Sequence, residues 1–258
     1  MEHFIWSADP VAFSLGSMHI YWYGILFAAA ILAGLEIVKW IFRREKKDLA
    51  LLDSMFIYVV VGIVVGARLG HCLFYDPAFY LANPLKILAI WEGGLASHGG
   101  GIGVLIALFL YVKKYKMDLL WLLDRIAIVT ALFGFFVRMG NFMNSEIVGH
   151  QTQVPWAIIF TKIDMLPRHP TQLYEAFAYL FIFFILVFIY ITRGRNLGKG
   201  FLFGLFLTLL FSARFVIEFV KEKQESYATD FLSTGQFLSI PFLLFGFMLI
   251  TLSLRKKA

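Results

Sequence analysis

Seven long apolar runs constrain this chain most, because each is close to the length that crosses a lipid bilayer. A bilayer core about 30 Å thick needs roughly 20 consecutive apolar residues in a helix. Backbone amides in hydrocarbon need internal partners, so such runs predict helices rather than open strands. Of the 258 residues, 60% are hydrophobic and 18% aromatic, which is typical of membrane proteins rather than soluble domains. The runs are residues 20–42, 51–72, 97–113, 119–141, 173–192, 199–219 and 236–254. The sequence predicts an all-α fold, a polytopic bundle of seven transmembrane helices forming one domain over residues 1–258.

Basic residues gather at alternate ends of these runs, and this predicts the orientation of the chain. The loops that follow the first, third, fifth and seventh runs carry fourteen of the 23 Lys and Arg residues. By the positive-inside rule these loops are cytoplasmic, which puts the N-terminus outside and the C-terminus in the cytoplasm. The segments at about 73–96, 142–172 and 220–235 are then extracytoplasmic. This distribution indicates that the basic residues behind the net charge of +6 lie beside a lipid bilayer. It argues against nucleic acid as a partner.

Polar side chains from several runs are predicted to meet at the outer level of the membrane. With a rise of 1.5 Å per residue, each member of this set falls near the outer end of its run. Charge is costly in hydrocarbon, so intramembrane arginines usually have a function. Snorkelling to lipid phosphates is the alternative, but Glu218 follows Arg214 on the same helix face and snorkelling does not explain it. The set comprises Tyr23, Arg68, His71, His98, Arg138 and Arg214.

The densest polar stretch is Arg138-Met-Gly-Asn141-Phe-Met-Asn144-Ser-Glu146-Ile-Val-Gly149. The arginine fork suits phosphate, and asparagine adds neutral donors without a further charge. Glu146 lies beyond the expected helix end, where its carboxylate can orient the guanidinium. The combination suits an anionic, hydroxylated ligand such as a lipid head group. A purely structural end-cap is the competing interpretation.

Two other stretches carry weaker signals. The glycine-rich segment around Ser97 and His98 is similar to the oxyanion loop of lipases, but it lacks their nucleophile elbow. His98 is a candidate for proton transfer or phosphate binding, and a structurally satisfied histidine is the alternative. Thr171 is expected to cap the fifth helix, and Glu175 to complement its dipole. Glu146 and His150 lack a third ligand, so we expect no metal.

Taken together and in order, these segments resemble the bacterial prolipoprotein diacylglyceryl transferases. The signature of that family reads Gly-Arg-x-Gly/Ala-Asn-Phe-apolar-Asn-x-Glu-x-x-Gly, and residues 138–149 match every fixed position after the first. Val137 stands in place of the first glycine. Lys221 stands where an arginine is usual in the family, and lysine cannot bind phosphate bidentately. Further matches are Tyr23 in Trp-Tyr-Gly, His98 in His-Gly-Gly, the stretch from Arg168 to Glu175, and Arg214 with Glu218.

The resemblance implies an enzyme that moves the diacylglyceryl group of phosphatidylglycerol to the lipobox cysteine of a prolipoprotein signal peptide. A thioether forms and glycerol phosphate is released, at the extracytoplasmic face of the bacterial cytoplasmic (inner) membrane. No cofactor is implied.

The resemblance also implies roles for single residues. Arg138 and Arg214 are expected to hold the phosphate, and His98 to accept the thiol proton or contact phosphate. Tyr23 would position lipid or peptide, and Glu146 and Glu218 would orient the arginines or bind glycerol hydroxyls. The expected lipid-binding set is Arg138, Asn141, Asn144, Glu146, Gly149, Arg214 and Glu218. Two alternatives stand beside this reading: a transporter for anionic lipid or small anions, and an intramembrane serine hydrolase using Ser97 and His98.

Overall fold

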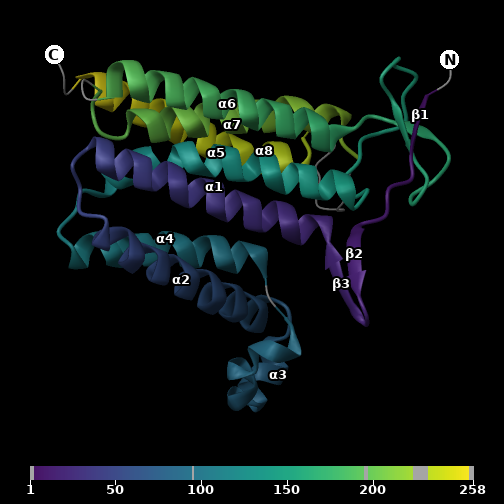
Figure 1. Cartoon of the computed structure of the whole chain (residues 1–258), viewed down its shortest axis with the longest axis horizontal. Coiled ribbons are helices and arrows are strands. Elements are labelled where there is room, and N and C mark those ends of the chain that lie inside the picture. The colour runs from purple at the N-terminus through teal and green to yellow at the C-terminus, as the bar shows by residue number, and fades with distance from the viewer. Residues whose placement is uncertain (1–2, 95, 195–196, 223–231, 256–258) are drawn as a thin grey trace. The chain divides into compact units, whose positions relative to one another are not determined.

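The computed structural model describes the chain except for residues 1–2, 95, 195–196, 223–231 and 256–258 (Figure 1). The chain forms two compact units, one of Met1–Val38 with Leu123–Ala258 and one of Lys39–Leu122. The expectation of a single domain over residues 1–258 stays a prediction.

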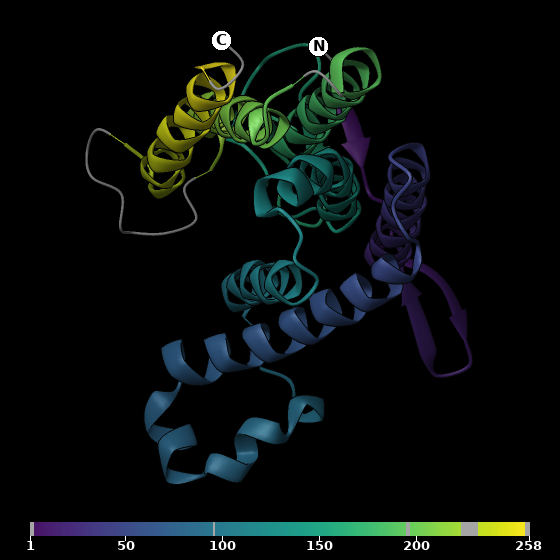
Figure 2. The same cartoon turned by 90° about the vertical axis from the view of Figure 1, so that its left-hand side faces the viewer.

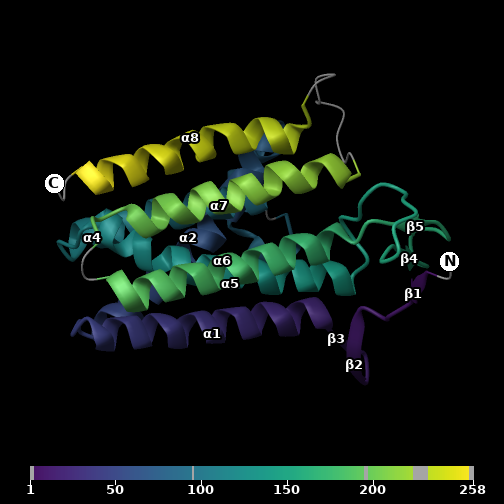
Figure 3. The same ribbon diagram turned by 90° about the horizontal axis from the view of Figure 1, so that it is seen from above.

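The larger unit is a bundle of long helices that run side by side (Figure 3). Aromatic rings pack between neighbouring helices: Phe27 meets Phe133 edge-on with centroids 5.1 Å apart, and Phe211 stacks on Phe242 at 4.5 Å. Gly204 allows a close approach there, because a Cβ would lie 2.8 Å from the Gly246 carbonyl oxygen. The helices are α1 (Trp22–Arg44, whose residues up to Val38 belong to this unit), α5 (Leu119–Met143, whose residues from Leu123 belong to it), α6 (Thr171–Arg193), α7 (Phe201–Ile217) and α8 (Thr234–Arg255).

The start of α7 is fixed by a carboxylate on α5. Gly200 takes a left-handed conformation with a φ of 88°, which glycine adopts without strain. Asp124 then accepts hydrogen bonds from the backbone amides of Gly200 and Phe203, each at 2.8 Å. The first amides of a helix have no partner within it, so Asp124 acts as a cap supplied by another helix.

Two small sheets, which the sequence analysis did not anticipate, lie in the larger unit. β1 (Phe4–Trp6) pairs in parallel with β4 (Ile158–Phe160), and β5 (Pro167–Arg168) pairs antiparallel with β4. β2 (Val11–Leu15) and β3 (Met18–Tyr21) form an antiparallel hairpin before α1. Phe142, at the end of α5, joins Phe160 and Trp6 in an apolar cluster that ties the first sheet to the bundle.

The smaller unit contains α2 (Ala50–Phe74) packed along α4 (Ser97–Lys114), as Figure 2 shows. Glycines allow this close packing, because a Cβ on Gly62 would lie 2.7 Å from the Gly103 carbonyl oxygen. A Cβ on Gly70 would lie 2.7 Å from the Gly99 Cα. Between the two helices the chain forms α3 (Pro77–Ala82) and the 3-10 turns η1 (Pro84–Leu88) and η2 (Ile90–Glu92).

Six helices in the described part of the chain are long and apolar enough to cross a membrane, which supports a multi-pass membrane protein. They are α1, α2, α5, α6, α7 with its extension to Val220, and α8. The seventh expected span, 97–113, is helix α4, which is not among the six. Its first turns contain Ser97, His98 and three glycines, and these supply little apolar surface. A count of seven spans and the orientation of the termini stay predictions.

Candidate functional site

The polar stretch at the end of α5 closes into a hydrogen-bonded turn. After Met143, Ser145 and Ile147 adopt positive φ angles of 57° and 59°, and these turn the chain back on the helix end. Arg138 Nη1 donates to Asn141 Oδ1 at 3.1 Å, and Asn141 Nδ2 donates to Glu146 Oε1 at 2.8 Å. Asn144 Nδ2 donates to the same glutamate oxygen at 3.2 Å. The structure therefore brings these four side chains together.

Helix α6 supplies a carboxylate that sequence reasoning did not place here. Glu175 Oε2 lies 2.7 Å from Arg138 Nε, and the glutamate side chain is 1% exposed. Gln172 Nε2 donates to the Glu146 carbonyl oxygen at 2.6 Å. The expectation that Thr171 caps α6 is wrong: its hydroxyl donates to the Ile147 carbonyl at 2.8 Å, while Pro170 occupies the cap position. These two hydrogen bonds from the first turn of α6 therefore hold the turn at residues 146–147 in place.

Arg214 reaches the same cluster from α7. Arg138 and Arg214 both donate to the hydroxyl oxygen of Tyr179, one turn after Glu175 on α6. Helix α7 tightens into a 3-10 turn over Glu218–Val220, after which Lys221 points into the cluster. Its Nζ lies 3.7 Å from Glu218 Oε2 and 3.8 Å from Glu175 Oε1. Lys221 is 9% exposed, so this position is a buried cation rather than a solvated one.

Gly149 has a steric reason to be glycine. It forms an isolated antiparallel bridge with Lys221, flanked by hydrogen bonds from His150 N to Val220 O at 2.9 Å and from Glu222 N to Val148 O at 3.2 Å. A Cβ on Gly149 would lie 2.6 Å from the His169 Cβ and 2.8 Å from the Thr171 Cγ2. Gly149 therefore lets the segment after α7 lie directly against the start of α6.

Tyr23 approaches the cluster from the first turn of α1. Its ring packs on Gly140, where a Cβ would lie 2.6 Å from the Tyr23 Cδ2. The phenol also lies within electrostatic range of Glu146 and Arg138. Tyr23 thus joins the arginine cluster, which we define as Tyr23, Arg138, Asn141, Asn144, Glu146, Glu175, Tyr179, Arg214, Glu218 and Lys221.

Positively and negatively charged side chains are equal in number in the arginine cluster. Its three cations, Arg138, Arg214 and Lys221, face the three carboxylates of Glu146, Glu175 and Glu218. Charge that is partly removed from water needs an opposite charge nearby, so the carboxylates stabilise this partly buried group of cations. Each guanidinium has five N–H donors. An incoming anion such as a phosphate can therefore take up donors not engaged within the cluster.

The predicted residues His98, Arg68 and His71 belong to the smaller unit. His98 lies exposed in the first turn of α4. Arg68 is 3% exposed and donates to the backbone carbonyls of Lys86, Ile87, Gly93 and Gly94. Arg68 thus holds the segment that precedes His98 rather than a ligand. That His98 acts together with Arg138 stays a prediction, and the side chain of Ser97 lies outside the described residues.

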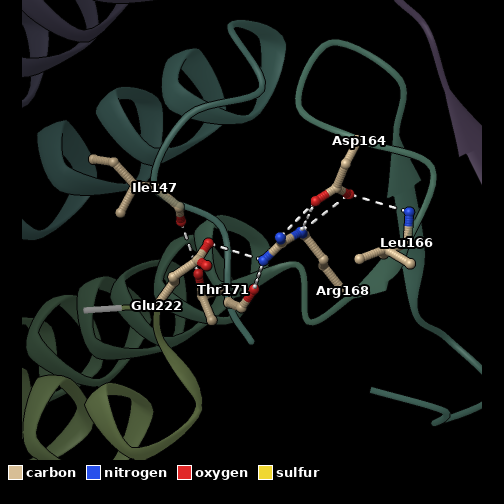
Figure 4. Close-up of polar contacts among 7 residues, drawn as sticks. Ile147, Asp164, Leu166, Arg168, Thr171 and Glu222 are labelled. Carbon is tan, nitrogen blue, oxygen red and sulfur yellow. Dashed lines mark hydrogen bonds and ion pairs between the residues drawn. The ribbon is translucent and has the colours of Figure 1, made fainter. Parts of the chain in front are cut away.

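A second ionic group is centred on Arg168 (Figure 4). Arg168 Nη2 lies 2.5 Å from Asp164 Oδ2, and Arg168 Nη1 donates to Glu222 Oε2 at 2.8 Å and to the Gly149 carbonyl at 3.3 Å. The hydrogen bond from Arg168 holds the pKa of Asp164 below its ordinary value. Arg168 therefore ties the 149–171 segment to the residue after Lys221.

Sequence reasoning missed Glu175 and Tyr179 as members of the cluster. A carboxylate close to the start of a helix is already explained by the helix dipole, so Glu175 gave no separate signal. Tyr179 lies four residues after Glu175 in an apolar run, and that i, i+4 spacing is the one sequence feature that links them.

Fold and site together define a class: a multi-pass membrane protein with a partly buried cluster of paired arginines and carboxylates at one end of a helix bundle, suited to an anionic ligand. The family model for prolipoprotein diacylglyceryl transferase matches residues 10–252. Similar proteins named phosphatidylglycerol–prolipoprotein diacylglyceryl transferase occur in Tolumonas auensis, 52% identical with 98% of each chain covered, and in Chloroherpeton thalassium, 45% identical with 99% of this chain and 96% of the relative covered. A third, from Bacteroides fragilis, is 42% identical with 98% and 96% covered. The chain belongs to the prolipoprotein diacylglyceryl transferase family, which confirms the resemblance seen in the sequence.

Proposed function

We infer that this protein transfers the diacylglyceryl group of phosphatidylglycerol to the lipobox cysteine thiol of prolipoproteins. Full-length similarity to relatives that carry this activity in their names supports the inference. The structural observation that carries it is the meeting of Arg138 and Arg214, from different helices, on the hydroxyl of Tyr179. The comparisons favour neither alternative, the transporter nor the serine hydrolase.

The reaction is a displacement at carbon. The cysteine sulfur forms a bond to the glycerol carbon that carries the phosphate ester, the carbon–oxygen bond breaks, and its electron pair leaves with glycerol phosphate. The thiol proton goes to a base, because a thiolate is the nucleophile. The leaving phosphate gains negative charge as the bond breaks, so fixed cations in a dry site stabilise the transition state.

The residues of the arginine cluster, together with His98 and Gly149, have separate roles in this scheme. Arg138 and Arg214 hold the phosphate, and Asn141 and Asn144 contact the head group. Glu146 and Glu218 orient the arginines or bind the glycerol hydroxyls. His98 accepts the thiol proton and Tyr23 positions lipid or peptide; Gly149 keeps the surrounding segments in contact.

The reaction takes place at the outer face of the bacterial cytoplasmic membrane, in a chain with seven spans, an outer N-terminus and a cytoplasmic C-terminus. The loop charges support this placement through the positive-inside rule. Both substrates are membrane-resident, so the site takes its lipid and its signal peptide from the bilayer itself.

The test is direct. Purified protein is incubated with phosphatidylglycerol vesicles and a lipobox peptide, and the peptide is weighed by mass spectrometry. We expect a mass gain of one diacylglyceryl group and an equal amount of glycerol phosphate. A peptide with serine in place of the cysteine is the control and should gain nothing. An unchanged cysteine peptide would contradict the proposed function.

A further inference from the structure

Glu175 is the most deeply placed carboxylate of the arginine cluster. It lies in the second turn of α6 and is 1% exposed. One oxygen lies 2.7 Å from Arg138 Nε and the other 3.8 Å from Lys221 Nζ. Glu175 thus bridges a cation from α5 and a cation from the segment after α7.

This bridge fixes the direction of the Arg138 guanidinium. A guanidinium is planar, so holding its Nε edge against Glu175 determines where its two terminal nitrogens point. One of them donates to Asn141, and Arg138 also donates to Tyr179. Glu175 and Tyr179 are four residues apart on one face of α6, so a single helix face aligns Arg138, Arg214 and Lys221.

The bridge also sets the charge of the site. With Glu175 ionised, the three cations of the cluster face three carboxylates; without its charge, the cluster carries one uncompensated positive charge. An extra positive charge attracts a dianion more strongly than a monoanion. In the proposed reaction the lipid phosphate is a monoanion, and the released glycerol phosphate approaches a dianion at neutral pH.

We propose that Glu175 is a positioning residue that aligns Arg138 with Lys221 and balances their charge, so that the site releases its glycerol phosphate product. This inference rests on the proposed function. It assigns to Glu175 a part in turnover distinct from the phosphate-holding part of the arginines. Lys221 is its counterpart, because it supplies the charge that Glu175 offsets.

The experiment is a double-mutant cycle of charge-neutralising substitutions: Glu175→Gln, Lys221→Met and the double variant. Each is assayed with phosphatidylglycerol and lipobox peptide, with glycerol-1-phosphate added as inhibitor. Glu175→Gln keeps the shape and an oxygen acceptor for Arg138 but leaves one excess positive charge. We expect inhibition by glycerol-1-phosphate to strengthen about tenfold, with kcat and KM for phosphatidylglycerol both reduced. Lys221→Met should weaken the inhibition, and the double variant should return it toward the wild-type value.

A merely structural role for Glu175 predicts a different result. The losses of kcat in the two single variants would then add in the double variant, and the inhibition constants for glycerol-1-phosphate would not shift in opposite directions. Asp53→Asn, an exposed carboxylate change on α2, is the matched control and should behave as wild type. If wild type transfers lipid and Glu175→Gln keeps its kcat, KM and product inhibition, the inference is wrong while the proposed function stands. If wild type transfers nothing, the proposed function itself is wrong.

Folding is followed by thermal unfolding in detergent. A Glu175→Gln protein that fails to fold, together with a double variant that folds, supports the charge-balancing role because removal of the unmatched cation rescues it. Failure of both to fold, when Lys221→Met folds, overturns the proposal.

Discussion

At the scale of single residues, Arg138 holds the arginine cluster together because it engages three partners at once. Its guanidinium contacts Glu175, Asn141 and Tyr179. A lysine ammonium is a compact point charge and cannot keep this planar set of contacts. Loss of one or two charge-assisted hydrogen bonds of about 1.5–3 kcal/mol each corresponds to a rate reduction of about 100-fold.

We therefore expect Arg138→Lys to reduce transfer of diacylglyceryl to a lipobox peptide by about 100-fold, and Arg138→Ala to reduce it further. The measurement is kcat/KM from peptide mass spectrometry. Arg43→Lys, an exposed substitution in the last turn of α1, is the control and should keep full activity. An Arg138→Lys enzyme close to wild type would show that charge alone suffices at this position.

The same residues mark what the sequence can and cannot predict about the site. Arg138, Asn141 and Glu146 were predicted to meet because they are neighbours in one helix end, where spacing determines proximity. Glu175 and Lys221 lie in other segments, and their pairing depends on how α6 and the end of α7 pack. A single sequence does not contain that packing, and Glu175 already had a local explanation in the dipole of its helix.

At the scale of elements, Gly149 allows three segments of chain to meet: its own, the start of α6 and the end of α7. An added methyl would overlap the Val220 carbonyl as well as His169 and Thr171. Overpacking of this kind typically costs about 1–3 kcal/mol. The Val220 carbonyl belongs to the backbone directly before Lys221, so relief of this overlap would displace Lys221.

We expect Gly149→Ala to lower both the melting temperature in detergent and the transfer activity, the latter by at least about tenfold. Gly101→Ala in α4 is a matched control, since nothing lies within 4 Å of its added Cβ. Equal behaviour of the two variants in both assays would argue against the close contact at Gly149.

The cap on α7 leads to a stability prediction. Asp124→Ala leaves the amides of Gly200 and Phe203 without the acceptor they share, and loss of a cap costs about 0.5–2 kcal/mol. We expect a lower melting temperature in detergent for Asp124→Ala than for Asp53→Ala, which removes an exposed carboxylate from the first turn of α2. Equal melting temperatures would mean that α7 starts without help from α5.

At the scale of the whole molecule, apolar length predicted the helices well and the strands not at all. The run 119–141 became α5, Leu119–Met143, because hydrocarbon length and helix propensity act locally. β1 and β4 each have three residues and pair across most of the chain, from Phe4 to Ile158. Strands this short carry no periodic pattern, and their pairing is decided by contacts far apart in sequence.

Whether the chain crosses the membrane six or seven times depends on α4, and labelling of the residues that flank this helix tests whether it crosses. Single cysteines are introduced at Asn83, before α4, and at Lys116, after it, in a Cys72→Ala background, and intact cells are treated with a membrane-impermeant maleimide. Both positions are exposed, so access to the reagent depends on the side of the membrane. The positive-inside rule predicts labelling of Asn83→Cys in intact cells and of Lys116→Cys only after permeabilisation.

Cysteines at Ser14 and Lys47, which flank α1, calibrate the two sides in the same way. If Asn83→Cys and Lys116→Cys are labelled from the same side, α4 does not cross and the predicted seven-span topology is wrong.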